Sequence, residues 1–443
     1  MFRPLLKMLV LGYLVLFTLS VKALLLYMYL QNPAEFMYRV EKGVYPVMDK
    51  LAYQLFGVTP SSKAAAVDVV ASAKLANPAS QANPENPAER AKLLADKAAA
   101  EQKQEQQQAQ QQEQQLQQEL LDQFGRWQPQ AATTSLTGVE LDGVSYATLA
   151  EAIKQLKDNS HLKIPAGVYQ EPLFIRHHNV TIEGVGHVVF EKAATQGKGY
   201  ILAAGNDLTV RNIECRFIKV DSKNGACVRL EGRGLVLDHV YFHSSETALL
   251  ETAKEHGYIR ISNSRFENLA GKARAHSIYL NKASLHLENS VILGNRHQHS
   301  LKSRGPKTVI DTSILSELSA SASRLIDISN GGELSISRSL LHKGPNSVNN
   351  QVIGFGLEGV QHSSNQISIR DSLLLLDRPT GNYIVHAGDN KVDTHIENNV
   401  IVASSEQWDG NIHLKTRAEL QLAAYPALPA ILCHLQRCAG KTP

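Results

Sequence analysis

Side chains that can bind an anion or move a proton recur at matching positions in two neighbouring segments of the chain. Tyr279 and Lys302 each lie six residues before the start of a repeated apolar motif, and Asn281 and Arg304 each lie four residues before it. The planar fork of an Arg can neutralise a carboxylate that lies next to a C–H bond. A Lys or His can then remove the proton, and a Tyr can protonate a leaving oxygen. The spacing therefore predicts a site for proton transfer beside a carboxylate.

Other polar residues share this register and complete the predicted site. His276 and His299 occupy one offset, and Asp327 lies on the following repeat. Strict alternation turns both histidines inward unless each strand begins after them. The residues that we expect to take part in catalysis are Tyr279, Lys302, Arg304, His276 and His299. The residues that we expect to bind substrate are His297, Asn281, Asp327, Asn330 and Arg274.

The apolar motif recurs nine times, with steps of 23 to 33 residues between its copies. A period of this length on strands of alternating pattern indicates a solenoid. Matching columns in successive copies imply that each strand stacks on the preceding one, about 4.8 Å away. The sequence therefore predicts an all-β parallel β-helix. Its nine copies begin at Val180, Leu208, Leu235, Ile259, Leu285, Thr308, Leu334, Ile367 and Thr394.

Two further columns run through these copies. The side chain seven residues after each start is apolar in every copy except the first: His187, Cys215, Phe242, Phe266, Ile292, Leu315, Leu341, Leu374 and Ile401. This column predicts a core that fills the coil from within. The fifth position of four copies holds an Asn, which suits a tight turn. We expect these side chains to form an inner ladder at one corner of the coil: Asn212, Asn263, Asn289 and Asn398.

Four cysteines are divided between the repeats and the C-terminus. We expect Cys215, in an apolar column, and Cys227, on a strand, to be buried apolar residues. Cys433 and Cys438 lie close together and could close a small disulfide loop in an oxidising compartment. No Cys/His spacing reads as a zinc site. The prediction is therefore a protein without a metal or another cofactor.

An open solenoid needs covered ends. At the N-terminal end, residues 146–156 place Leu149, Ile153 and Leu156 on one face of a predicted helix, and a strand at 162–169 follows. At the other end, the Ala/Leu-rich residues 411–443 form a predicted cap. The β-helix itself is expected between residues 135 and 410.

These segments resemble a known superfamily. The short helix, the Ile-Pro-Ala-Gly-Val-Tyr run at 164–169 and the Val-Thr-Ile-Glu-Gly strand at 180–184 are similar to the N-terminal part of pectin-lyase-like right-handed parallel β-helix proteins. That resemblance covers residues 135–405. Segments 276–279, 302–304 and 330–332 also resemble uncharacterised bacterial β-helix proteins with an N-terminal membrane anchor. The narrower resemblance implies no activity.

The superfamily includes uronate lyases, polygalacturonases, epimerases and binding proteins, so the resemblance implies an acidic polysaccharide as partner. A cluster of Arg, Lys and Tyr favours a lyase or a C5-epimerase, since hydrolysis needs paired carboxylates and only Asp327 is an obvious acid. Calcium-dependent lyases of this fold use several Asp, and no Asp cluster is present, so calcium is not indicated. A non-catalytic module that binds or exports a polysaccharide is the alternative, and an assembly protein is a third class.

The first thirty residues predict export. Arg3 and Lys7 precede an apolar stretch, residues 8–30, which contains one charge and is long enough to cross a bilayer. The positive flank places the short end in the cytoplasm. We expect an uncleaved signal anchor, residues 1–34, rather than a signal peptide cleaved at Ala23. The β-helix would then lie in the periplasm, anchored to the inner membrane.

Two segments separate this anchor from the β-helix. Residues 35–88 end in a linker rich in Ala, Ser, Asn and Pro, and residues 89–128 are dominated by Gln, Glu and Ala, which favours helix. Because apolar residues stripe only the C-terminal part of this helix, we expect a solvated spacer, with an oligomerising coiled coil as the alternative. The formal net charge of +3, without a basic stripe, argues against a nucleic-acid partner.

Overall fold

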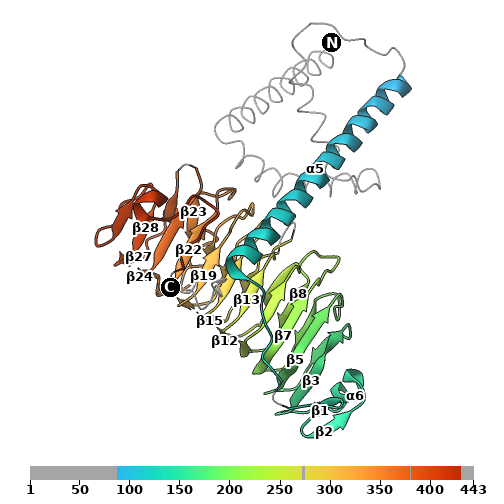
Figure 1. The fold of residues 1–443 in the computed structure, drawn as a ribbon. Coiled ribbons are helices and arrows are strands. Elements are labelled where there is room, and N and C mark those ends of the chain that lie inside the picture. The colour runs from blue at the N-terminus through green and yellow to red at the C-terminus, as the bar shows by residue number, and fades with distance from the viewer. Residues whose placement is uncertain (1–86, 133, 272–274, 380, 431–443) are drawn as a thin grey trace, which may run out of the picture. The chain divides into compact units, whose positions relative to one another are not determined.

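The computed structural model describes residues 87–132, 134–271, 275–379 and 381–430. Contacts divide the chain into two units, residues 1–97 and 98–443, and the β-helix lies in the second unit (Figure 1). None of the described helices combines the length and hydropathy needed to cross a membrane. The predicted anchor at 1–34, nearly all of segment 35–88, and Cys433 and Cys438 lie outside the described residues.

The β-helix is right-handed, has about nine coils, and presents three faces. The site face is a parallel sheet of nine strands: β4 Leu173–Ile175, β6 Gly199–Ala203, β8 Ala226–Leu230, β11 Thr247–Glu251, β14 Ile278–Leu280, β17 Leu301–Ser303, β20 Ile326–Ile328, β23 Gln351–Phe355 and β26 Tyr383–His386. The second face consists of β3 His161–Tyr169, β5 Thr181–Glu191, β7 Leu208–Arg216, β9 Leu235–Asp238, β12 Tyr258–Ser262, β15 Ser284–Glu288, β18 Lys307–Asp311, β21 Glu333–Ser337, β24 Gln366–Arg370 and β27 Asp393–Glu397. The third face, onto which β5 and β7 continue, consists of β10 Tyr241–His243, β13 Arg265–Glu267, β16 Val291–Leu293, β19 Ile314–Ser316, β22 Leu340–Lys343, β25 Leu373–Leu376, β28 Val400–Val402 and β29 Ile412–Leu414.

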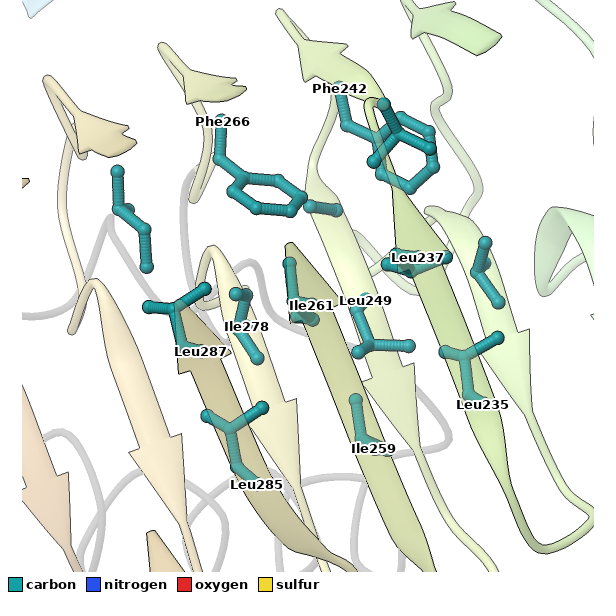
Figure 2. Packing of buried hydrophobic residues seen from close by; sticks show 14 of the residues in the cluster. Leu235, Leu237, Phe242, Leu249, Ile259, Ile261, Phe266, Ile278, Leu285 and Leu287 are labelled. Atoms are coloured by element: carbon teal, nitrogen blue, oxygen red, sulfur yellow. The ribbon is translucent and has the colours of Figure 1, made fainter. Parts of the chain in front are cut away.

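Apolar columns fill the interior between the faces, as the repeat predicts. On the second face Leu237 pairs in register with Ile261, and on the third face Phe242 pairs with Phe266. Figure 2 shows these side chains packed in one cluster with Ile278 of the site face. All five are 0% exposed, and burying a side chain of this size contributes roughly 1.5–3 kcal/mol. Stacked columns therefore confirm the parallel β-helix and hold its coils in register.

The first copy departs from the predicted column. The pairing of β5 with β7 shifts between Glu183 and Val188, so Phe190 rather than His187 pairs with Cys215 in the core. His187 points outward, with 52% of its side chain exposed. A fixed offset from the repeat start fails here because β5 carries extra residues at the shift.

The corner between the second and third faces also differs from the prediction. The four asparagines do make the turn, with φ between 46° and 56°. However, Asn263 and Asn398 are exposed, and only Asn212 is buried, so the asparagines form no inner ladder. Serines one residue later form it: Ser264, Ser290, Ser313, Ser339 and Ser372. Each of the first four donates its backbone N–H to the Oγ of the serine in the following coil, and Ser372 donates its N–H to Asn399 Oδ1.

A disulfide joins Cys215 to Cys227. Both residues are 1% exposed, which confirms their predicted burial, but the interpretation of the two as plain apolar residues is wrong. Cys215 lies on β7 and Cys227 on the next strand of the same coil, β8, and their Cα atoms are 5.9 Å apart. The bond closes the loop between the third face and the site face.

Replacing Cys215 and Cys227 by serine is expected to lower the free energy of unfolding by about 2–4 kcal/mol, because a native cross-link restricts the unfolded chain. The measurement is the midpoint of urea unfolding with and without reductant. Reductant should lower the wild-type midpoint to that of the double variant and leave the variant unchanged. A wild-type midpoint that does not respond to full reduction would contradict this role of the disulfide.

The outer surface of the third face becomes apolar from β16 onward. Helix α5, Pro87–Phe124, covers part of it with Leu116, Leu120 and Phe124. A C-terminal segment that includes the 3-10 turn η2, Arg417–Leu420, packs on the same apolar cluster through Leu414, Leu420, Leu422 and Leu428. The apolar stripe of the predicted spacer is therefore buried within its own chain. The cluster on the third face consists of Val291, Leu293, Ile314, Leu318, Ala320, Leu340, Leu373, Leu375 and Val402.

The N-terminal end of the solenoid is closed by two antiparallel strands and a short helix: β1 Val139–Leu141, β2 Val144–Tyr146 and α6 Leu149–Ile153. The helix is shorter than the predicted 146–156. Thr148 begins it with a capping box, in which the Thr148 hydroxyl accepts from the Glu151 N–H and the Glu151 carboxylate accepts from the Thr148 N–H. Leu149 and Leu156 pack into the core as predicted.

Candidate active site

The predicted site lies on the outer surface of the site face. Tyr279 of β14 pairs in register with Lys302 of β17, and Lys302 pairs with Asp327 of β20. The residues on either side of Lys302, Leu301 and Ser303, are 0% exposed and point into the coil. Because neighbouring strands lie about 4.8 Å apart, the Tyr279, Lys302 and Asp327 side chains form one outward column.

Lys302 lies at the centre of an ion-pair network. Its Nζ donates to Asp327 Oδ2 at 2.9 Å and to Glu358 Oε1 at 2.7 Å. Arg304 donates to Glu358 Oε2 from Nε, at 3.1 Å, and also from Nη2. The guanidinium lies 5.0 Å from the centre of the Tyr279 ring. The side chains of Lys302 and Asp327 are nearly buried, whereas that of Glu358 is 40% exposed. The site thus presents two cations to one exposed carboxylate.

Sequence reasoning missed Glu358. It lies in the loop after β23, inside the repeat that is 33 residues long. The extra length of this repeat is the only feature of the sequence that indicates a longer loop here. Gly356 and Gly359, with φ of 68° and 95°, allow the loop to turn back over the sheet. Asn330 fixes it by donating Nδ2 to the Gly359 carbonyl at 2.9 Å. A predicted substrate-binding residue therefore positions the loop that carries Glu358.

Both acids of this network are ionised. Burial raises the pKa of Glu358, but hydrogen bonds from Lys302 and Arg304 outweigh burial and hold that pKa below its ordinary value. Burial likewise raises the pKa of Asp327, but the charges of His299 and Lys302 and the hydrogen bonds from Ser329 and Lys302 together hold that pKa well below its ordinary value. Across the described part of the chain, no three His, Cys, Asp or Glu side chains are arranged to hold a metal ion.

His276 and His299 occupy the corners before β14 and β17, because each strand begins two residues after its histidine. Nδ1 of His276 accepts the His299 backbone N–H, and Nδ1 of His299 accepts the Arg324 backbone N–H, both at 3.2 Å. The two rings stack with centroids 5.1 Å apart. A neutral imidazole that accepts at Nδ1 carries its proton on Nε2. Both histidines therefore present a hydrogen-bond donor at Nε2 rather than a base.

The two rings are kept neutral by their surroundings. Burial lowers the pKa of His276 well below its ordinary value, and the nearby His299 and Lys302 lower it further. Burial also lowers the pKa of His299 to about 4, although Asp327 opposes that shift. The outward column thus faces uncharged imidazole donors at neutral pH.

The His299 shift predicts a loss of stability in mild acid. Between pH 6.5 and about 4 the unfolded chain binds a proton at His299 that the folded chain does not, so the free energy of unfolding falls as pH drops through this window. We expect a loss of about 2 kcal/mol between pH 7 and pH 5. Urea unfolding at the two pH values measures it.

A His299→Asn variant should lose the His299 share of this pH dependence and keep the share of His276, whose pKa is also lowered, because an amide oxygen can still accept the Arg324 N–H but does not titrate. His286→Asn is the matched control, since His286 lies half-exposed on the second face, and it should keep the wild-type slope. Equal slopes in wild type and His299→Asn would show that His299 titrates normally in the folded protein.

The other predicted substrate-binding residues are dispersed around the column. Asn281 is half-buried in the corner after β14 and aligns with Arg304 when the strand register is extended. His297 is exposed in the corner before β17. In the next coil Ser329, and not Asn330, aligns with Arg304, so the predicted register is off by one there. Arg274 lies outside the described residues.

Comparisons with known proteins found similarity in structure. No family model and no curated protein matches the chain. The tailspike protein of Escherichia coli bacteriophage HK620, solved with a pentasaccharide, is 14% identical with a TM-score of 0.36, and the match covers 54% of this chain and 43% of the tailspike. The chain thus spans less than half of the tailspike.

Two pectin methylesterases are also similar. That of Aspergillus niger is 13% identical with a TM-score of 0.36, and the match covers 68% of this chain and 95% of the esterase. One solved with a hexasaccharide is 12% identical with a TM-score of 0.28 over the same shares. The nine-stranded site face, the parallel ladders and the apolar columns show a right-handed parallel β-helix, the fold that the resemblance in sequence led us to expect.

Proposed function

We propose that this β-helix acts on an acidic polysaccharide as a uronate lyase or a C5-epimerase. One observation carries the proposal: a single exposed carboxylate, that of Glu358, accepts hydrogen bonds from both Lys302 and Arg304 on the outer surface of the site face. A uronate carboxylate has the same charge and geometry. It would take this position by displacing Glu358, because an Arg fork and a Lys ammonium suit any carboxylate that reaches them.

The chemistry follows from that position. Charge neutralisation of the uronate carboxylate by Arg304 makes the C5 proton removable. Tyr279, whose ring lies against the Arg304 guanidinium, takes this proton as a phenolate. The C5–H electrons form the C4=C5 double bond, the C4–O bond breaks, and the leaving oxygen receives the proton from Tyr279. In epimerisation a proton instead returns to the opposite face of C5. That proton comes from water, and Tyr279 passes its own proton to solvent. The Nε2–H of His276, whose ring contacts Tyr279, is available to hydrogen-bond the sugar.

The test is an absorbance assay for unsaturated uronates with the full-length protein on alginate, pectate and hyaluronan. Absorbance should rise on one polymer and should vanish in Tyr279→Phe, whereas Tyr258→Phe, which changes an exposed Tyr of the second face, should behave as wild type. Proton NMR of the treated polymer detects epimerisation. If neither double bonds nor inverted C5 centres form, the proposal fails, and a non-catalytic role in polysaccharide binding or export takes its place.

A second candidate function is glycoside hydrolysis, because the network contains two carboxylates. Asp327 and Glu358 both bond Lys302 Nζ, so their nearest oxygens lie less than about 6 Å apart, a bound that includes the roughly 5–5.5 Å spacing of retaining glycosidases. Glu358→Gln separates the two candidates. A lyase or epimerase would keep its activity and bind substrate more tightly, since an internal competitor is gone. A hydrolase would lose all activity.

We further propose that the β-helix lies in the periplasm behind a single inner-membrane anchor. The Cys215–Cys227 disulfide supports this proposal, because such bonds persist in oxidising compartments. The apolar segment 8–30 with its basic N-terminal flank supports the anchor. Alkylation of intact and permeabilised cells, without and with reductant, tests whether this disulfide forms in the living cell.

A further inference from the structure

A row of basic side chains follows the corner at the carboxyl ends of the site-face strands. When the pairing of the strands is continued past their carboxyl ends, Arg304 aligns with Asn281 of the preceding coil. Asn281 aligns in turn with Thr252, and Thr252 with Glu231, in the two coils before it. Each of these four consecutive coils has a Lys or an Arg at the aligned position or within two residues of it. We call these four residues the corner row: Arg233, Lys254, Lys282 and Arg304. At about 4.8 Å per coil the corner row extends over roughly 14 Å.

The spacing of this row is fixed by close stacking of the coils. At Gly205, Gly232 and Gly305, which lie in the same corner, an added Cβ would meet a carbonyl oxygen of the preceding coil at 1.9–2.0 Å. Only glycine permits this approach. The corner therefore cannot widen at these glycines, and the coils that carry the cations stay at the strand spacing.

A cavity of about 600 Å³ lies at the end of the corner row that is remote from Arg304. Its lining includes Arg233, Lys254, Glu231 and Glu255. Arg233 pairs with Glu255 at 3.0 Å, but these side chains are 50% and 70% exposed, so solvent screens the pair and a ligand can compete for the arginine. Lys254 is exposed. The volume is in the range of small-molecule sites.

One more cation lies beside Glu231, which lines this cavity. Arg229 stands in the outward column of the site face, in register with Leu250, which pairs with Tyr279. Its Nε is buried and has no hydrogen-bond partner among the described residues, and Glu231 lies 3.8 Å away. A buried guanidinium nitrogen without an acceptor is costly. Arg229 itself is not among the residues that line the cavity, so its contribution there is the positive charge that it adds beside Glu231.

We infer that the corner row and its cavity bind further carboxylates of the same acidic polysaccharide whose reacting uronate lies at Arg304. The inference rests on the proposed function and adds to it an extended site for a polyuronate that runs parallel to the solenoid axis. A cation at every coil suits a polymer with a carboxylate on every sugar. A neutral glycan would leave the row unused.

The experiment measures affinity by calorimetry with the full-length protein and two probes, the monosaccharide galacturonate and a galacturonate decasaccharide. Lys254→Ala/Lys282→Ala should weaken binding of the decasaccharide about tenfold and leave the monosaccharide unchanged, because only the longer probe reaches both lysines. Lys154→Ala/Lys307→Ala removes the same charge from exposed positions outside the row and should bind both probes as wild type does.

The outcomes separate the two proposals. If Lys254→Ala/Lys282→Ala binds both probes as wild type does while Arg304→Ala weakens both, the corner row is refuted and the proposed function stands. If Arg304→Ala changes neither affinity, the proposed function itself fails. A single-stranded oligonucleotide of equal charge that displaces the decasaccharide at equal concentration would also overturn the inference, since the row would then bind any polyanion.

Discussion

Arg304→Ala is expected to lower kcat/KM on the polymer that the protein acts on by about a hundredfold to a thousandfold. Arg304 provides two hydrogen-bond donors to the carboxylate position that Glu358 now fills, and its charge is needed most when the C5 proton leaves. Loss of one preorganised donor at a developing charge costs about 2.7–4 kcal/mol in other enzymes. Steady-state rates from the unsaturated-uronate or NMR assay measure the effect.

One further variant separates the effect of the Arg304 charge on catalysis from that of its planar geometry, and a second variant is the control. Arg304→Lys keeps the charge but not the planar fork, so it should recover only part of the lost activity. Arg370→Ala removes an exposed arginine of the second face, whose guanidinium donates to Ser368 Oγ, and should leave kcat/KM unchanged. Full activity in Arg304→Ala would mean that no substrate carboxylate is bound at this position.

Lys343→Met should destabilise the protein by about 3–5 kcal/mol. Lys343 Nζ donates to Glu317 Oε1 at 2.9 Å and to Ser347 Oγ at 2.6 Å, and both charged side chains are 0% exposed. Burial lowers the pKa of Lys343, and Glu317 opposes that shift. Removing the lysine leaves the Glu317 carboxylate buried without its counter-charge, which is the costly way to break such a pair. The midpoint of urea unfolding reports the loss.

The double variant Lys343→Met/Glu317→Gln should recover much of that stability, because an amide is neutral and its oxygen can still accept the Gly344 N–H. Lys307→Met is the matched control. Lys307 pairs with Glu333 at 3.1 Å, but the side chains are 56% and 38% exposed, and a pair of this kind contributes about 1 kcal/mol or less. Similar losses in Lys343→Met and Lys307→Met would show that Lys343 is solvated.

The fold could be predicted because the repeat constrains it twice. Each copy alternates in polarity, and the copies align in columns such as Leu237 with Ile261, so strand position and strand pairing follow from one pattern. Prediction failed where the pattern breaks. His187 does not lie in the predicted core column, because the pairing of β5 with β7 shifts in register. The disulfide was missed because it joins two strands of the same coil, whereas the columns compare only equivalent positions of different coils.

The site could be predicted only in part for the same reason. Tyr279, Lys302 and Asp327 lie on strands, so repeat offsets place them together. Glu358, Lys254 and Lys282 lie in loops, where no period fixes the position of a side chain. The tautomers of His276 and His299 could not be predicted either, because they depend on hydrogen bonds from the backbone of the following coil.

The packing of α5 on the third face sets an order for folding. Leu116, Leu120 and Phe124 are made first, but their partners begin at Val291, 167 residues after Phe124. At a synthesis rate of about 5–20 residues per second, roughly ten to thirty seconds pass between the synthesis of Phe124 and that of the first of those strands. During that interval the cluster that covers its apolar stripe has not been synthesised, so the segment around Phe124 is where we expect a chaperone or a neighbouring chain to bind.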